Sequence, residues 1–240
     1  GVAKNATIHG VRVLNCEGSG WTDDICEGLS WIKTHVGSHG SPAVVSASLG
    51  GNSVDSTLTA CFDDLVTVGI TVVVAAGNSA SNACGFSPAY STKVVTVGAT
   101  ASTDNLASFT NFGTCVDIFA PGVSIMSAGI AGPTSAATFS GTSMACPHVT
   151  GAVAMYLSSP GNGEKSPTQV LDWLEGQAVK GKIEGIQVCT NDEDDVSPNS
   201  LLQTCINLDG SPCYTLPPPP PLPSQPSPPP PPPPLSPPLP

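Results

Sequence analysis

The chain has 240 residues, of which 40% are apolar and only 10% charged, and its formal net charge is −11 with seven lysine and arginine residues in total. This much apolar sequence can bury the core of one main domain. The shortage of cations excludes a nucleic-acid-binding protein, which needs clustered positive charge, and no apolar run approaches the about 20 residues of a membrane-spanning helix.

Short apolar runs rich in β-branched residues alternate with helical patterns along the chain. This alternation predicts an α/β fold with a doubly wound, mostly parallel sheet and helices on both faces. Ligands of such sheets bind outside the carboxyl ends of the strands, where Gly50-Gly51 and Gly77-Asn78 are expected. The expected strands are residues 8–14, 44–49, 71–76, 94–97 and 116–119.

Helices are expected between and after these strands. The first covers residues 23–36, with Thr22 as its N-cap and Gly37 as its stop. The second carries apolar residues at helical spacing from Val54 to Val66, and Gly69 can end it in the left-handed conformation.

Ser166-Pro167-Thr168-Gln169 predicts the start of a later helix. A serine followed three residues later by glutamine forms a capping box, and proline is favoured at the first helical position. We expect this helix to turn Val170, Leu171 and Leu174 inward.

The last residues differ in composition from the rest of the chain. Residues 217–240 are nearly all proline, which has no backbone donor and adopts polyproline II. We therefore place the folded domain in residues 1–208 and a linker with a stiff proline-rich tail in residues 209–240.

Nine cysteines favour an oxidising compartment, because their spacing shows no paired Cys-x-x-Cys zinc pattern. Their odd number leaves one cysteine unpaired. We expect this to be Cys146, which lies in a small-residue helix where a thiol packs as a small apolar group. A nucleophilic role for Cys146 is the alternative.

Gly141-Thr142-Ser143-Met144-Ala145-Cys146-Pro147-His148-Val149-Thr150-Gly151 places a serine at the start of this helix. A serine hydroxyl is a weak nucleophile until a positioned base takes its proton. His148 lies about 500° of helical rotation away from Ser143 and cannot be that base. Ser143 is either a nucleophile with a base from elsewhere or an N-cap serine.

The motif resembles that of the subtilisin-like serine proteases, and among them the proteinase K-like branch, in which the serine follows the acid and the histidine along the chain. The resemblance extends from Gly1 to about Leu202. It includes Gly1-Val2-Ala3-Lys4, Ala75-Ala76-Gly77-Asn78, Phe86-Ser87-Pro88-Ala89 and Asp117-Ile118-Phe119-Ala120-Pro121-Gly122. Because Gly1 to Lys4 resemble the segment after the catalytic histidine, we expect an N-terminally truncated domain that lacks the catalytic Asp and His and is inactive by itself.

The resemblance implies roles for individual residues. Ser143 would be the nucleophile, and the Asn78 side chain would be an oxyanion donor beside the N–H groups of the helix start; a turn asparagine is the alternative for Asn78. An extended peptide would bind between two walls, Ser48 to Gly50 and Ala75 to Gly77, and along an edge, Gly18 to Gly20. The alternative is that these glycines only form turns. These substrate-binding positions are Gly18, Ser19, Gly20, Ser48, Leu49, Gly50, Ala75, Ala76 and Gly77.

A structural calcium ion is also implied by the resemblance, held by the Thr92 and Val94 carbonyls and the Asp117 carboxylate, a mixed oxygen set that calcium accepts. An aspartate at a strand end is the alternative, and the chemistry itself requires no cofactor.

The expected function is secreted, extracellular serine endopeptidase activity on polypeptide substrates through an acyl-enzyme. The tail resembles hydroxyproline-rich matrix proteins of algae and plants, which implies cell-wall or matrix association. A non-catalytic extracellular matrix or cell-wall protein on the same scaffold is the alternative.

Overall fold

The structure is a computed structural model that describes residues 1–39, 42–186 and 196–203. Its centre is a six-stranded sheet in the order β1-β2-β3-β4-β8-β7, parallel except for the antiparallel pair of β7 and β8. The strands are β1 Val44–Ala47, β2 Thr71–Ala75, β3 Val95–Thr100, β4 Ile118–Pro121, β7 Val179–Lys180 and β8 Ser200–Leu201. Four of the five expected strands therefore form, with ends that differ from the prediction by at most three residues.

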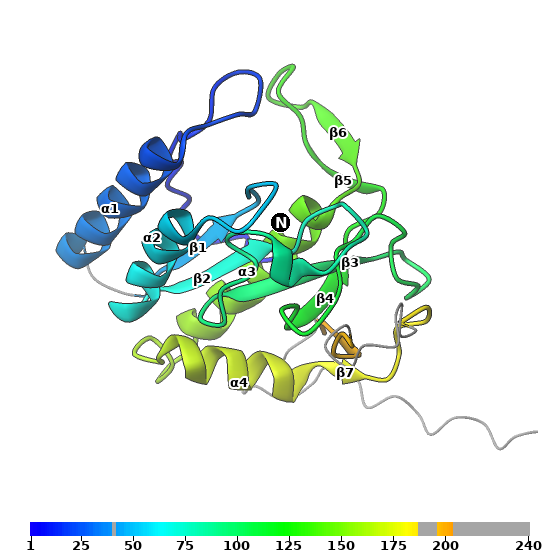
Figure 1. Cartoon of the computed structure of the whole chain (residues 1–240). Coiled ribbons are helices and arrows are strands. Elements are labelled where there is room, and N and C mark those ends of the chain that lie inside the picture. The colour runs from blue at the N-terminus through cyan, green and yellow to red at the C-terminus, as the bar shows by residue number, and fades with distance from the viewer. Residues whose placement is uncertain (40–41, 187–195, 204–240) are drawn as a thin grey trace, which may run out of the picture.

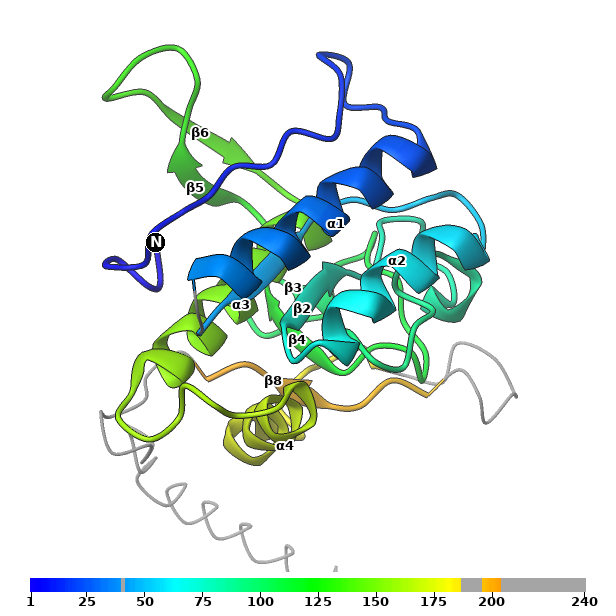
Figure 2. The same cartoon turned by 90° about the vertical axis from the view of Figure 1, so that its left-hand side faces the viewer.

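Helices cover both faces of the sheet, which confirms the doubly wound fold (Figures 1 and 2). Helices α1 Thr22–His39 and α2 Ser56–Thr67 lie on one face, and α3 Thr142–Ser158 and α4 Pro167–Gln177 on the other. Strand β2 shows why: Val72 and Val74 join the apolar cluster of α1 and α2, whereas Val73 joins that of α3 and α4. Successive side chains of a strand point to opposite faces, so the fully apolar β2 serves both cores.

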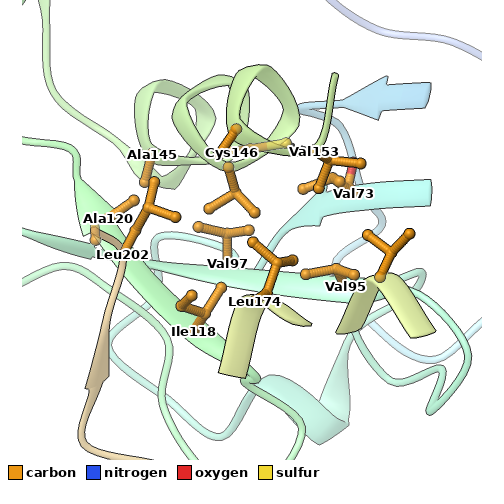
Figure 3. Packing of buried hydrophobic residues seen from close by; sticks show 14 of the residues in the cluster. Val73, Val95, Val97, Ile118, Ala120, Ala145, Cys146, Val153, Leu174 and Leu202 are labelled. Atoms are coloured by element: carbon orange, nitrogen blue, oxygen red, sulfur yellow. Dashed lines mark hydrogen bonds between the residues drawn. The ribbon is translucent and has the colours of Figure 1, made fainter. Parts of the chain in front are cut away.

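The core beneath α3 and α4 is drawn in Figure 3. Val97 and Ile118 of the sheet, Cys146 of α3 and Leu174 of α4 meet there, each at most 1% exposed. The α3 residues in this core are mostly alanine, valine and cysteine, which let the helix approach the strands closely. That approach places the N-terminal turn of α3 next to the end of β2.

The ends of the helices follow local capping chemistry. The Asp55 carboxylate accepts the Thr57 and Leu58 N–H groups at 2.9 and 3.1 Å, so it is the N-cap of α2. Gly69 follows α2 at φ +88, as expected. The capping box between Ser166 and Gln169 at the start of α4 is also confirmed.

Three details of the helix predictions are wrong. Val54 precedes α2 and is 46% exposed, because Asp55 supplies the cap after it. Gly37 does not end α1, which continues to His39. Thr22 is the first residue of α1 rather than its N-cap, and its hydroxyl donates to Asp55 Oδ2 at 2.8 Å.

The strand expected at residues 8–14 is also wrong, because no described strand pairs with this segment. Ile8 is 90% exposed, and a Cβ on Gly28 of α1 would touch Val11 and Val13. The apolar side chains of the segment therefore pack against helix α1. Because its backbone has no neighbouring strand to pair with, the segment does not form a strand. The hairpin of β5 Ile125–Ala128 and β6 Ala136–Phe139, which extends from the body in Figure 1, and the 3₁₀ turn η1 Ala83–Gly85 were not predicted.

Disulfides join Cys26 to Cys61, and Cys84 to Cys115. Cys146 is buried with a free thiol, as expected. Cys16 is a second free cysteine among the described residues, whereas Cys189, Cys205 and Cys213 lie outside them. The predicted boundary near residue 208 and the proline-rich tail also lie outside the described part. No described helix is long and apolar enough to cross a membrane.

Candidate active site

Ser143 lies in the first turn of α3, at the carboxyl edge of the sheet. Its side chain is partly exposed, and neither its hydroxyl nor its backbone N–H has a hydrogen-bond partner among the described residues. The N–H is unpaired because the first N–H groups of a helix have no carbonyl one turn earlier. A hydroxyl and an N–H donor are therefore both available at the positive end of the helix dipole.

Asn78 follows β2 and is connected to this helix start. Its Oδ1 accepts the backbone N–H of Thr142 at 2.8 Å and the Thr142 hydroxyl at 3.0 Å. That hydroxyl also accepts the Gly77 N–H at 3.2 Å, and Thr142 is fully buried. Rotation of the amide by 180° would turn Nδ2 toward the Thr142 N–H, which is also a donor, so Oδ1 stays on the Thr142 side and Nδ2 remains free to donate.

The two unpaired donors both lie close to Gly141. A Cβ built on Gly141 would lie 3.6 Å from Ser143 N, 3.6 Å from Asn78 Oδ1 and 3.7 Å from Asn78 Nδ2. Asn78 Nδ2 makes no hydrogen bond to a described residue. A backbone N–H and an amide N–H near a hydroxyl are groups of the kind that stabilise an oxyanion formed by attack of that hydroxyl.

Asn111 belongs to this site, although the sequence did not reveal it. It is fully buried, and its side chain and backbone bond to residues on both sides of Asn78. The sequence signal that could have found it is a polar residue between Phe109 and Phe112.

The wall residues Ser48, Leu49 and Gly50 lie beside the helix start. The Ser48 hydroxyl donates to the Ser143 carbonyl at 2.9 Å, and a Cβ on Gly50 would lie 2.8 Å from the Ser87 carbonyl. The other wall, Ala75 to Gly77, ends β2, and the Gly77 N–H bonds to Thr142. The structure thus brings both expected walls next to Ser143.

Gly18, Ser19 and Gly20 are not joined to this cluster by any hydrogen bond. They form an exposed turn in which the Asn15 N–H donates to the Ser19 carbonyl at 2.8 Å, with Gly18 at φ +78. The turn borders a cavity of about 880 Å³ between residues 11–15 and α1. The glycines therefore have a local role in a turn, whatever else they bind.

No described histidine side chain is hydrogen-bonded to Ser143. His148 Nδ1 lies 2.8 Å from the Met144 carbonyl in its own helix. The His9 and His35 rings lie 4.9 Å apart, and His35 stacks on Trp31. His39 ends α1, and its side chain lies outside the described part. Ser143 thus has no hydrogen bond to the side chain of a described histidine.

Asp117 precedes β4 and is mostly buried. Burial raises the pKa of its carboxyl to about 7, although the Thr96 N–H, which donates to Oδ2 at 2.7 Å, acts in the opposite direction. Oδ1 has no partner among the described residues, and the Thr92 and Val94 carbonyls accept no described hydrogen bond. Unpaired oxygens of these types fit calcium. The described residues contain no group of three histidine, cysteine or acidic side chains that could hold a metal.

Comparison with known proteins adds the family context. The sequence model of a family described as the subtilase family matches residues 1–201. The extracellular serine proteinase of Thermus sp. (strain Rt41A) is 52% identical over 157 residues, which cover 65% of this chain and 37% of that protein. Alkaline serine exoprotease A of Vibrio alginolyticus is 44% identical over 183 residues, which cover 76% of this chain and 33% of that protein.

A solved structure is also similar. The crystal structure of a cold adapted subtilisin-like serine proteinase matches with a TM-score of 0.77 and 39% identity, covering 86% of this chain and 70% of that one. The chain spans about a third of the length of the two curated relatives described above.

Proposed function

The chain belongs to the subtilase family, and on that premise we propose that it is the serine-bearing part of a secreted serine endopeptidase that cleaves polypeptides through an acyl-enzyme. The observation that carries the proposal is the cluster at the start of α3. There the Ser143 hydroxyl has no described hydrogen-bond partner, and the unpaired Ser143 N and Asn78 Nδ2 both lie near Gly141. Secretion is supported by the name of the Thermus relative, an extracellular proteinase, and by the two disulfides.

In the proposed mechanism, Ser143 Oγ attacks the carbonyl carbon of the scissile peptide bond. The oxyanion that forms accepts hydrogen bonds from Asn78 Nδ2 and the Ser143 N–H, and the α3 dipole adds to this stabilisation. Thr142 contributes by keeping Asn78 Oδ1 turned away from the oxyanion. Collapse of the intermediate expels the amine and leaves an acyl-Ser143, which water hydrolyses.

The base that takes the Ser143 proton, and the acid that orients this base, are proposed to come from residues outside the 240-residue sequence. This is supported by the positions of the described histidines, since His148 is bonded within its own helix and His9 and His35 contact each other. By itself the 240-residue chain is therefore proposed to be inactive.

Substrate is proposed to bind as an extended strand along Ser48 to Gly50 and Ala75 to Gly77, with Gly18 to Gly20 as the opposite edge. Such binding uses main-chain hydrogen bonds, and glycine permits the close approach that it needs. The wall at Ala75, Ala76 and Gly77 is small and uncharged, which favours an apolar or aromatic residue before the scissile bond over a basic one.

Calcium is proposed as a structural ion held by the Thr92 and Val94 carbonyls and Asp117, with no part in the chemistry. The support is the mostly buried carboxylate with one unpaired oxygen. Association with a cell wall or matrix through the proline-rich tail is proposed from composition alone.

The decisive experiment is labelling with a fluorophosphonate, which reacts only with an activated serine. The polypeptide that the gene encodes in full should be labelled, and Ser143→Ala should abolish the labelling. Ser158→Ala is the matched control, because Ser158 is an exposed serine at the other end of the same helix. The 240-residue chain should not react.

Two results would contradict the proposal. If the full polypeptide is not labelled, the non-catalytic matrix protein becomes the better account of this scaffold. If the 240-residue chain is labelled at Ser143, the base lies within it and the proposed external base is wrong.

A further inference from the structure

Asn111 lies in the connection between β3 and β4, and its side-chain hydrogen bonds to described residues all go to one short segment. Its Nδ2 donates to the Ala76 carbonyl at 2.8 Å, and its Oδ1 accepts the N–H groups of Ser79 and Ser81 at 2.9 and 3.3 Å. Its backbone N–H donates to the Gly77 carbonyl at 2.9 Å. These partners lie on both sides of Asn78 in residues 76–81, which we call the oxyanion loop.

Burial makes these bonds hard to exchange. Asn111 has no exposed surface, and a buried amide that loses its partners costs free energy because water cannot replace them. If the oxyanion loop moved away from Asn111, the Asn111 side-chain amide and the N–H groups of Ser79 and Ser81 would all lose their hydrogen-bond partners. The segment is therefore held in one position relative to the sheet.

Gly77 strengthens this coupling. Its φ of +103 is in the left-handed region, and a Cβ on it would overlap Asn111 Nδ2 and lie 3.2 Å from Asn111 Cγ. Gly77 therefore packs directly against the Nδ2 end of the Asn111 side chain. A turn of this shape at residue 77 determines the direction in which the chain enters Asn78.

Asn78 is thus held at two points. Thr142 bonds to its side-chain oxygen, which selects the amide orientation, and Asn111 bonds to the main chain on both sides of it. Orientation by Thr142 is effective only if the backbone of Asn78 is in the correct place, because a catalytic donor must be held within about 0.5 Å of its productive position.

We propose that Asn111 is a positioning residue for oxyanion stabilisation, which sets the place of Asn78 without touching substrate. The inference rests on the proposed peptidase function, since it assigns Asn111 a part in the same step. Its effect should appear in kcat, because a misplaced oxyanion donor weakens binding of the transition state and leaves binding of the substrate nearly unchanged.

The first test compares Asn111→Ala and Asn111→Asp with the unaltered protein, in the polypeptide that the gene encodes in full and with a peptide substrate. Asn111→Ala should lower kcat by about 10- to 100-fold and change KM by less than about threefold. The upper limit is the loss of about 10²–10³ on removing the oxyanion asparagine itself, a value measured in a subtilisin, a member of this family. Asn111→Asp keeps the side-chain volume but turns an oxygen toward the Ala76 carbonyl, so it should also lower kcat.

A double-mutant cycle with Asn78→Ala separates positioning from general structural damage. If Asn111 acts through Asn78, Asn111→Ala should lower kcat by less than about threefold once Asn78 is alanine. Ser200→Ala is the matched control, because Ser200 of β8 is buried and its hydroxyl accepts a hydrogen bond from Lys180 of β7, near the other edge of the sheet. It should lower thermal stability and leave kcat unchanged. Equal effects of Asn111→Ala in both backgrounds would overturn the inference.

Hydrogen–deuterium exchange keeps the inference testable if the polypeptide shows no peptidase activity. In the folded chain, Asn111→Ala should speed exchange of the Ser79 and Ser81 amides by at least about tenfold, as expected when a buried hydrogen bond is lost, and Ser200→Ala should not. Unchanged exchange at these amides would refute the positioning role. Absence of labelling and turnover together with faster exchange would instead refute the peptidase proposal and retain the structural coupling.

Discussion

Replacement of Gly77 by alanine tests the geometry of the oxyanion loop, and replacement of Gly69 in the same chain provides the control. Gly77 and Gly69 have similar left-handed φ values of +103 and +88. A Cβ on Gly69 would meet no heavy atom within 4 Å, whereas a Cβ on Gly77 would overlap Asn111 Nδ2. Gly69→Ala therefore measures backbone strain alone, and Gly77→Ala measures strain together with a clash against a buried amide.

The expected cost follows from these two contributions. An L-residue in the left-handed region costs roughly 1–2 kcal/mol at either position. Overpacking of a buried site adds roughly 1–3 kcal/mol, and it applies only at Gly77. We therefore expect Gly77→Ala to lower the free energy of unfolding by roughly 2–5 kcal/mol and Gly69→Ala by roughly 1–2 kcal/mol.

The assay is urea unfolding of the chain, followed by circular dichroism, with equal m-values required for the comparison. In an Asn111→Ala background the additional cost of Gly77→Ala should shrink, because the atom that the new methyl group meets is gone. If Gly77→Ala is no more destabilising than Gly69→Ala, the packing of Gly77 on Asn111 is wrong, and with it the argument for the oxyanion loop.

Three further predictions concern stability. If calcium binds at Asp117, a chelator should lower Tm, and the loss of stability should be about 2.7 kcal/mol relative to a calcium concentration of 100 times Kd. Asp117→Asn should remove most of this sensitivity to the chelator. Equal Tm values with and without chelator would exclude calcium. Replacing Cys26 and Cys61 together by serine removes a disulfide that joins residues with a sequence separation of 35. The free energy of unfolding, measured by urea titration, should fall by roughly 4 kcal/mol, because the unfolded chain gains conformational entropy. A loss below about 1 kcal/mol would contradict this argument. Ser166→Ala should cost about 1 kcal/mol by removing the capping box of α4, and an unchanged Tm would show that this cap contributes nothing.

Local patterns in the sequence determined much of this fold. Four strands and the capping box of α4 were predicted from residues close together in the chain, because strand alternation, N-capping and left-handed glycine are local effects. Ser143 was placed correctly at a helix start for the same reason, since the small residues after it could only pack as a buried helix. Cys146 was predicted to be a buried free thiol because it lies among those small residues.

The tertiary structure decided what depends on contacts between distant segments. Residues 8–14 have a strand-like pattern, yet Val11 and Val13 face α1, and no local signal distinguishes a helix from a strand as the partner of an apolar run. Asn111 is an ordinary asparagine in the sequence, and its importance depends on bonds to residues 30 to 35 positions away. Only folding brings these groups together, because a buried amide must find its partners wherever the chain places them.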